Sequence, residues 1–336
     1  MSKRHAHRPK VLVTGGCGFV GSAVVRGLLH RGYLVAVLDN LESGTLENLP
    51  RHRHLEVVRG DICSDSDLWT AGRGCSRLIH LAAVAFIPQS FEDPASAWRV
   101  NAEGSENVLR LAEEQRLDRV VLASTAEVYG AVGNMALSEG RSLFPISPYA
   151  ESKVAMERLA LGLGRENEQQ VVVLRLFNAY GPRATQPYVI PEIIRQAVEG
   201  DVISVGNAAA ERDFTYITDT AEGVIRAMET ADAAGETINL GSGEATSVID
   251  AVELTGRLLN KRLTVFKDEA RLRPRDIPVL RAENAKAKML LGWHPTTTLE
   301  RGLRATLEWY RGQPEGWSYE RWGQIRAAGD TATSTV

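Results

Sequence analysis

The stretch Thr14-Gly-Gly-Cys-Gly-Phe-Val-Gly21 decides the fold that we predict for this chain. It follows a short apolar run, Lys10-Val-Leu-Val-Thr14, which is typical of a buried parallel strand. Apolar residues at helical spacing then continue to His30. A strand that enters a helix through glycines spaced Gly-x-x-Gly-x-x-Gly is the backbone arrangement that holds a pyrophosphate.

Each glycine of this turn has its own predicted role. Gly15 permits the tight change of direction, Gly18 lets the backbone approach the phosphates, and Gly21 allows the helix to pack closely on the sheet. The pyrophosphate would then lie at a helix N-terminus, where unpaired N–H groups and the helix dipole favour anions. We therefore include Phe19 and Val20, which open the helix, among the cofactor contacts.

The alternation of apolar runs and helical patterns continues along the chain. Further strands are predicted at residues 33–38, 55–59, 77–81, 119–124 and 171–176, and further helices at about 95–116 and 149–164. Strands that alternate with helices imply right-handed crossovers and a parallel sheet covered on both faces. We predict an α/β protein with a doubly wound parallel (Rossmann) sheet and a smaller mixed α/β C-terminal substrate lobe.

Changes in composition along the sequence set the predicted domain boundaries. Residues 10–180 form the predicted NAD-binding Rossmann domain, with the Tyr149–Lys153 helix included. Glycine, proline and short mixed elements follow, so residues 181–315 form the substrate lobe, which has room for one strand that returns to the sheet. Residues 1–9 and 327–336 are predicted to be flexible tails.

Composition excludes several classes of protein. The 336 residues are 44% hydrophobic, which is enough for a sizeable core, and the net charge is −3 without a basic stripe, so nucleic acid is not an expected partner. We find no secretory signal and no apolar run long enough to cross a bilayer, so no membrane partner is expected. The three cysteines lack metal-ligand spacing, which predicts no metal site and fits a reduced, cytoplasmic compartment.

Residues at the ends of the second and third strands favour NAD over NADP. Asp39 can accept hydrogen bonds from a ribose diol, and its charge would repel a 2′-phosphate. Asn40 is uncharged, so no arginine stands there to bind that phosphate. Asp61 can accept from the adenine amino group. Taken alone, Asp39-Asn40 could equally be a turn and Asp61 a plain loop residue. Small side chains close to the cofactor are also expected in Leu81-Ala82-Ala83, which could equally serve as core packing.

The pair Tyr149 and Lys153 predicts hydride-transfer chemistry. On a helix, a spacing of four residues places both side chains on one face. A nearby ammonium favours the phenolate and lowers the phenol's pKa, and oxidised nicotinamide adds further positive charge. Tyr149 could then remove a proton from a sugar or alcohol hydroxyl while hydride leaves the carbon for NAD. Thr125, at the end of the fifth strand, could hold the reacting oxygen. Glu127, in the same loop, is either an acid or base or a solvated loop carboxylate.

Together these motifs resemble the extended short-chain dehydrogenase/reductase family, the nucleotide-sugar epimerases and dehydratases. The resemblance runs from Val11 to about Tyr310. It implies that Thr125, Tyr149 and Lys153 are the catalytic trio. It also implies further NAD contacts, at Asp61-Ile62, at Leu81-Ala82-Ala83, and at the structural and cofactor-side asparagine Asn101.

The resemblance also implies where the substrate binds. Asn178 would contact a diphosphate, Val189 lies in the stretch that passes the nucleotide base, and Arg212 would bind phosphates or ribose. Arg273 opens an Arg-Pro-Arg-Asp segment in which Arg275 replaces the family's glycine. A guanidinium suits a diphosphate because it can bind it in a bidentate way. The expected substrate is a nucleotide diphosphate sugar, with UDP favoured. A homodimer joined through helices at 101–116 and 149–164 is expected by analogy, although these faces could equally be intrachain core.

The reaction depends on two adjacent residues. Members of the family oxidise the sugar at C4 and then diverge. Ala126 cannot donate a proton to a leaving hydroxyl, which is epimerase-like, whereas Glu127 is typical of dehydratases and decarboxylases. We therefore expect an NAD-dependent 4-epimerase of a UDP-hexose or UDP-uronate. The alternatives are a 4,6- or 5,6-dehydratase or a UDP-glucuronate decarboxylase that uses Glu127, and, more remotely, a non-catalytic NAD-binding protein.

Overall fold

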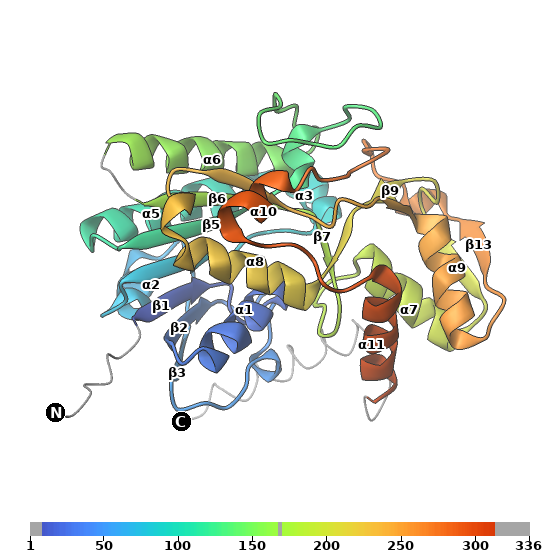
Figure 1. Ribbon diagram of the computed structural model, residues 1–336, viewed down its shortest axis with the longest axis horizontal. Coiled ribbons are helices and arrows are strands. Elements are labelled where there is room, and N and C mark those ends of the chain that lie inside the picture. Colours follow the sequence, from blue (N-terminus) through green and yellow to red (C-terminus); the bar gives the residue numbers. More distant parts are fainter. Residues whose placement is uncertain (1–8, 167–169, 313–336) are drawn as a thin grey trace.

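A seven-stranded parallel sheet forms the centre of the protein. The structure is a computed structural model that describes residues 9–166 and 170–312, and Figure 1 shows its layers. The strand order is β11-β6-β5-β4-β1-β2-β3, and every pair is parallel. The strands are β1 (Lys10–Thr14), β2 (Leu34–Asp39), β3 (Leu55–Arg59), β4 (Arg77–His80), β5 (Arg119–Thr125), β6 (Val171–Leu176) and β11 (Thr237–Leu240). The predicted doubly wound α/β fold is confirmed.

Helices cover both faces of this sheet, which explains why its inner strands β1, β2, β5 and β6 are mainly apolar rather than alternating, whereas the edge strand β3 is partly exposed. Val11 and Val13 pack with α1 (Phe19–His30), α8 (Ile217–Glu229) and α10 (Ala285–Leu291). Leu12, between them, packs on the opposite face. There the core is completed by α2 (Asp65–Gly72), α5 (Gly104–Glu114) and α6 (Pro148–Glu166).

The helix predicted at about residues 95–116 is interrupted. It consists of α4 (Pro94–Trp98), a π-helical turn labelled η2 (Arg99–Glu103), and α5. A π turn carries one extra residue per turn, and such turns occur frequently at functional sites. Asn101 and the buried Val100 and Ala102 lie in this turn.

A smaller unit stands beside the sheet, on the right of Figure 1. Its core joins α7 (Val189–Glu199), α9 (Val248–Leu259) and α11 (Leu299–Arg311). Three short sheets accompany them: β8 (Val202–Val205) with β13 (Thr264–Lys267), β7 (Asn178–Tyr180) with β10 (Phe214–Tyr216), and β9 (Glu211–Arg212) with β12 (Thr246–Ser247). The remaining elements are α3 (Ile87–Glu92), η1 (Leu46–Asn48), η3 (Ala126–Tyr129), η4 (Ala231–Ala233) and η5 (Glu269–Arg271).

The chain beyond residue 180 returns to the large sheet. Strand β11 pairs with β6 at the edge, and α8 and α10 pack on the face that carries α1. Of the predicted tails at 1–9 and 327–336, all but Pro9 lie outside the described residues.

Trp293 ties the returning segment to the sheet. Its side chain is 1% exposed, lies in the core beside α1 and α8, and donates from Nε1 to the Asp219 carbonyl at 2.8 Å. We expect Trp293→Ala to lower the free energy of unfolding by about 3–5 kcal/mol, because it leaves a large cavity. Urea denaturation measures this. Met289→Ala, in α10 and 75% exposed, is the control and should change stability by less than about 0.5 kcal/mol. Equal losses in the two variants would contradict the assignment.

Candidate active site

A large cavity opens at the carboxyl ends of the parallel strands, where open α/β sheets bind ligands. Its volume is about 1020 Å³, at the upper end of the range for ligand pockets. Residues of the sheet and of the smaller unit line it together. The predicted site residues that line it are Gly15, Gly18, Phe19, Val20, Gly21, Asp39, Asn40, Asp61, Ile62, Leu81, Ala82, Ala83, Thr125, Glu127, Tyr149, Lys153, Asn178, Val189, Arg212 and Arg273.

The glycine turn forms a cradle that side chains would fill. Gly15 has a φ of +69°, and a Cβ there would lie 2.6 Å from the Ala82 nitrogen. A Cβ on Gly21 would overlap the Gly15 carbonyl. Helix α1 begins after Gly18 without a capping side chain and without an acidic residue in its first turn. Its first N–H groups therefore remain available to an anion, and the cradle fits a pyrophosphate.

The next part of the cavity is acidic. Asp39 is buried, and its carboxylate accepts hydrogen bonds from the N–H groups of Cys17 at 2.8 Å and Leu41 at 2.9 Å. Burial raises the pKa of Asp39, and these two hydrogen bonds oppose the rise. Glu42 and Asp61 line the same cavity, each within 3.5 Å of the Asn40 amide. The carboxylate of Asp39 keeps acceptor capacity for a diol.

Asn101 does not line the cavity. Its amide oxygen accepts from the Val84 N–H at 2.8 Å, and its amide nitrogen donates to the Val84 carbonyl and the Ser152 hydroxyl, both at 3.1 Å. The side chain is fully buried. Asn101 therefore fixes the loop after β4 to the helix that carries Tyr149, and its predicted contact with the cofactor stays a prediction.

His80, at the end of β4, continues this support. Its Nδ1 lies 2.7 Å from the Thr14 hydroxyl and its Nε2 2.9 Å from the Ser105 hydroxyl, which donates to the Asn101 carbonyl at 2.6 Å. Because Ser105 donates onward, it accepts from Nε2–H, which leaves Nδ1 to accept from Thr14. Burial lowers the pKa of His80 to about 3, so the imidazole is neutral. A chain of hydrogen bonds therefore joins the glycine turn to the π turn.

Tyr149 and Lys153 lie in α6 and are almost fully buried. Lys153 donates from Nζ to the Ala123 carbonyl at 2.9 Å, and burial lowers its pKa to about 8. Burial also raises the pKa of Tyr149, and a hydrogen bond with Thr125 opposes the rise. Burial is the largest cause of this rise, so the predicted lowering does not hold for the protein without ligands, and the part assigned to oxidised nicotinamide stays a prediction.

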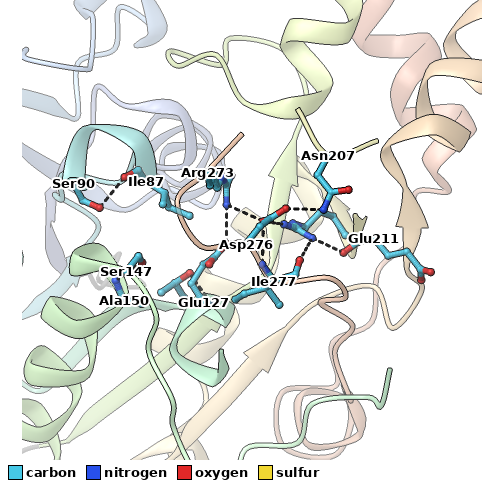
Figure 2. Close-up of polar contacts among 12 residues, drawn as sticks. Ile87, Ser90, Glu127, Ser147, Ala150, Asn207, Glu211, Arg273, Asp276 and Ile277 are labelled. Carbon is cyan, nitrogen blue, oxygen red and sulfur yellow. Dashed lines mark hydrogen bonds and ion pairs between the residues drawn. The ribbon is translucent and has the colours of Figure 1, made fainter. Parts of the chain in front are cut away.

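Glu127 faces the cavity opposite Arg273, as Figure 2 shows. The carboxylate is largely buried, and Oε1 lies 3.4 Å from Arg273 Nη1. Burial raises the pKa of Glu127, while Arg273 and Arg212 oppose the rise. It also adds to the raised pKa of Tyr149, so the two groups interact. Of the two predicted roles, this geometry favours an acid or base over a solvated loop carboxylate.

The two predicted substrate arginines differ. Arg212 is 4% exposed and donates to Asp276 Oδ1 at 2.7 Å and to the carbonyls of Glu211 and Ile277. Arg273 is 26% exposed at its side chain and pairs, among the described residues, with Glu127 and, at 4.0 Å, with Asp276. Arg212 is therefore fixed in the wall, and Arg273 is the freer cation of the two.

Two polar residues of this wall carried no predicted role. Asn207 donates to Asp276 Oδ2 at 3.0 Å, and both line the cavity (Figure 2). Asp276 ends the Arg273-Pro-Arg-Asp276 segment, so that motif could have identified it, whereas Asn207 belongs to no segment that carried a prediction. Arg275, which replaces a glycine of the family segment, is exposed and does not line the cavity.

The remaining predicted substrate residues lie on the smaller unit's side. Asn178 opens β7 and donates from its N–H to the Asp213 carbonyl at 3.0 Å, and Val189 opens α7. Before Val189, the ring of Tyr188 meets that of Phe86 edge to face at 6.3 Å. Within residues 9–166 and 170–312 no cluster of acidic, histidine or cysteine residues could hold a metal. No helix of that same part is both long and apolar enough to span a bilayer.

Comparisons with known proteins identify the family of this chain. The family model described as GDP-mannose 4,6 dehydratase matches residues 12–306. The dTDP-glucose 4,6-dehydratase of Streptomyces niveus is 33% identical over 323 residues, which cover 92% of this chain and 94% of the relative. UDP-glucuronic acid decarboxylase 1 of Xenopus tropicalis is 31% identical over 324 residues, which cover 92% of this chain and 73% of the relative.

A solved structure gives the same result at the level of the fold. The UDP-glucose 4-epimerase of Thermus thermophilus, solved in complex with NAD, has a TM-score of 0.84 at 31% identity and covers 90% of this chain and 99% of its own. The family model spans most of the chain, and the relatives match nearly its whole length. The chain therefore belongs to the GDP-mannose 4,6-dehydratase-like family of nucleotide-sugar epimerases, dehydratases and decarboxylases, within the extended short-chain dehydrogenases/reductases.

Proposed function

We propose that this protein is an NAD-dependent nucleotide-sugar 4-epimerase that acts on a UDP-hexose or UDP-uronate. The observation that carries the proposal is one cavity that contains the pyrophosphate cradle, the acidic Asp39 region and Tyr149 with Thr125. The named relatives act on nucleotide sugars, and the solved neighbour binds NAD. A homodimer through the 101–116 and 149–164 helices remains part of the proposal.

The residues of this chain divide the chemistry between them. NAD, when bound, supplies the hydride acceptor. Gly15, Gly18 and Asp39 hold it by its phosphates and ribose. Thr125 orients the C4 hydroxyl, and Tyr149 takes its proton as the C4–H bond breaks. Tyr149 needs added positive charge for this, because burial alone favours the neutral phenol.

Epimerisation returns hydrogen to C4 and leaves the rest of the sugar intact. Ala126 supports this outcome because its side chain is buried, apolar and unable to protonate a leaving hydroxyl. Arg273, the freer cation, would bind a diphosphate or a uronate carboxylate in the same cavity.

A lyase is the second candidate, and one observation favours it. Glu127 is a desolvated carboxyl with a raised pKa that faces the cavity close to Tyr149. Such a group suits removal or delivery of a proton at the sugar carbon next to a C4 ketone. Loss of water or of carbon dioxide would follow. The relatives named as dehydratase and decarboxylase keep this candidate open.

Replacing Tyr149 tests the shared first step. We expect Tyr149→Phe to reduce kcat by about 10²–10⁴-fold, because the variant lacks the proton acceptor. Product formation from UDP-sugars, followed by proton NMR, measures the effect, and titration with NAD checks that the cofactor still binds. Wild-type turnover in this variant would remove Tyr149 from its role.

Glu127→Gln separates the two candidates. An epimerase should keep its turnover within a few fold, whereas a lyase should lose about 10²-fold or more, because its proton-transfer group is gone. The product mass settles the reaction independently. An unchanged mass means isomerisation, and loss of water or carbon dioxide from the sugar would overturn the epimerase proposal.

Asp39→Ala tests the cofactor preference. Removal of the buried charge should lower the ratio of NAD to NADP affinity by about tenfold or more, because a 2′-phosphate is no longer repelled. Binding of both cofactors by calorimetry measures the ratio. Glu47→Ala, which removes an exposed carboxylate outside the cavity, is the matched control. An unchanged ratio in Asp39→Ala would contradict this assignment.

A further inference from the structure

Helix α6 carries a third ionisable side chain in line with Tyr149 and Lys153. Glu157 follows Lys153 by four residues, so all three share one stripe of the helix. Lys153 and Glu157 are each 2% exposed. The proposed reaction uses Tyr149 and Lys153 and gives no role to Glu157.

Glu157 is held as a carboxylate in a dry environment. Arg175 binds it in a bidentate way, with Nε 3.0 Å from Oε1 and Nη2 2.7 Å from Oε2. The Ser124 hydroxyl donates a third hydrogen bond to Oε1. The side chains of this ion pair are only 3% and 6% exposed. A buried carboxylate stays ionised only with such charge-assisted hydrogen bonds.

Lys153 has only uncharged acceptors in direct contact among the described residues. Its Nζ donates to the Ala123 carbonyl at 2.9 Å and lies 3.8 Å from Met156 Sδ. It forms no ion pair with any described carboxylate. Ala123 and Ser124 are consecutive in β5, directly before Thr125. One segment of strand therefore binds Lys153 and Glu157 and carries Thr125, which is proposed to orient the reacting hydroxyl.

Among the described groups near Lys153, Glu157 is the carboxylate that supplies a fixed negative charge. Glu157 on α6 and His80 on β4 interact electrostatically with Lys153. Tyr149 precedes it by one turn of α6, and two elements that contact α6 carry Glu127 (η3) and Arg175 (β6). His80 is neutral, and Glu127 is paired with Arg273 at 3.4 Å. The elements α3, α4, η2 and α5 also contact α6. The buried residues of α3, α4, η2 and the first turn of α5 are uncharged: Ser90, Ala97, Val100, Asn101, Ala102, Gly104 and Ser105.

We propose that Glu157, fixed by Arg175 and Ser124, is a positioning residue that keeps Lys153 protonated and thereby maintains the cation beside Tyr149. The proposal rests on the proposed function only in giving Lys153 its part beside Tyr149. It is consistent with the pKa of Lys153, which burial lowers and Glu157 raises. Without the carboxylate, Lys153 should lose its proton at lower pH.

The test measures the titration of Lys153 in the cofactor-free protein by NMR of ¹³C-labelled lysine, with Lys153→Arg to assign the signal. We expect Glu157→Gln to move the midpoint down by about one pH unit. The alkaline limb of the kcat/KM profile should move in the same direction, because activity falls as the ammonium loses its proton. Glu157→Asp, which keeps the charge, should stay near the wild-type midpoint.

Two further variants keep the result decisive. Glu222→Gln removes a paired carboxylate in α8, bound by Arg31 and Arg226. This control should shift neither the Lys153 titration midpoint nor the alkaline limb of the kcat/KM profile. Should Glu157→Gln fail to fold because Arg175 is left unpaired, the double variant Glu157→Gln/Arg175→Met removes both charges and should give a smaller downward shift. An unchanged Lys153 midpoint in the folded variant overturns the proposal. A shifted midpoint in a protein that turns over no nucleotide sugar would uphold it and refute the proposed function instead.

Discussion

Removal of ionisable groups from water is the constraint on which this site depends. Burial is the largest cause of the pKa shift at Asp39, Glu127, Tyr149 and Lys153. Each group has a different opposing partner: backbone N–H groups for Asp39, arginines for Glu127, the Thr125 hydroxyl for Tyr149, and the carboxylate of Glu157 for Lys153. Because little solvent screens charges in this cavity, a bound cation or anion would shift the pKa values of these four groups strongly.

Much of the fold and most of the cavity wall could be predicted from the sequence. The inner parallel strands β1, β2 and β5 are buried on both faces, so each appears as a mainly apolar run with a glycine, aspartate or polar residue at its end. Those strand ends meet at one edge of the sheet, which is why Gly15, Asp39 and Thr125 line one cavity. Local motifs were sufficient here because the fold itself brings the ends together.

Other features depend on contacts that no local pattern encodes. The pairing of Glu157 with Arg175 and that of Arg212 with Asp276 join different elements. The lobe was predicted with room for one returning strand, but no pattern showed that this strand is β11 at the edge beside β6. The direction of the Tyr149 pKa shift in the protein without ligands could not be predicted for the same reason. Spacing along a helix shows that a lysine is near, but only the packed structure shows how far water is excluded.

The π turn at Arg99–Glu103 has a consequence for comparing this chain with others. A turn with an additional residue rotates everything that follows it by about 100° relative to a regular helix. The apolar residues of α4 and α5 both lie against the same core, but the spacing between the two sets in the sequence is not that of one continuous α-helix. An aligned protein with an unbroken α-helix here must carry a one-residue gap, and without that gap Ser105 would no longer align with the position that meets His80.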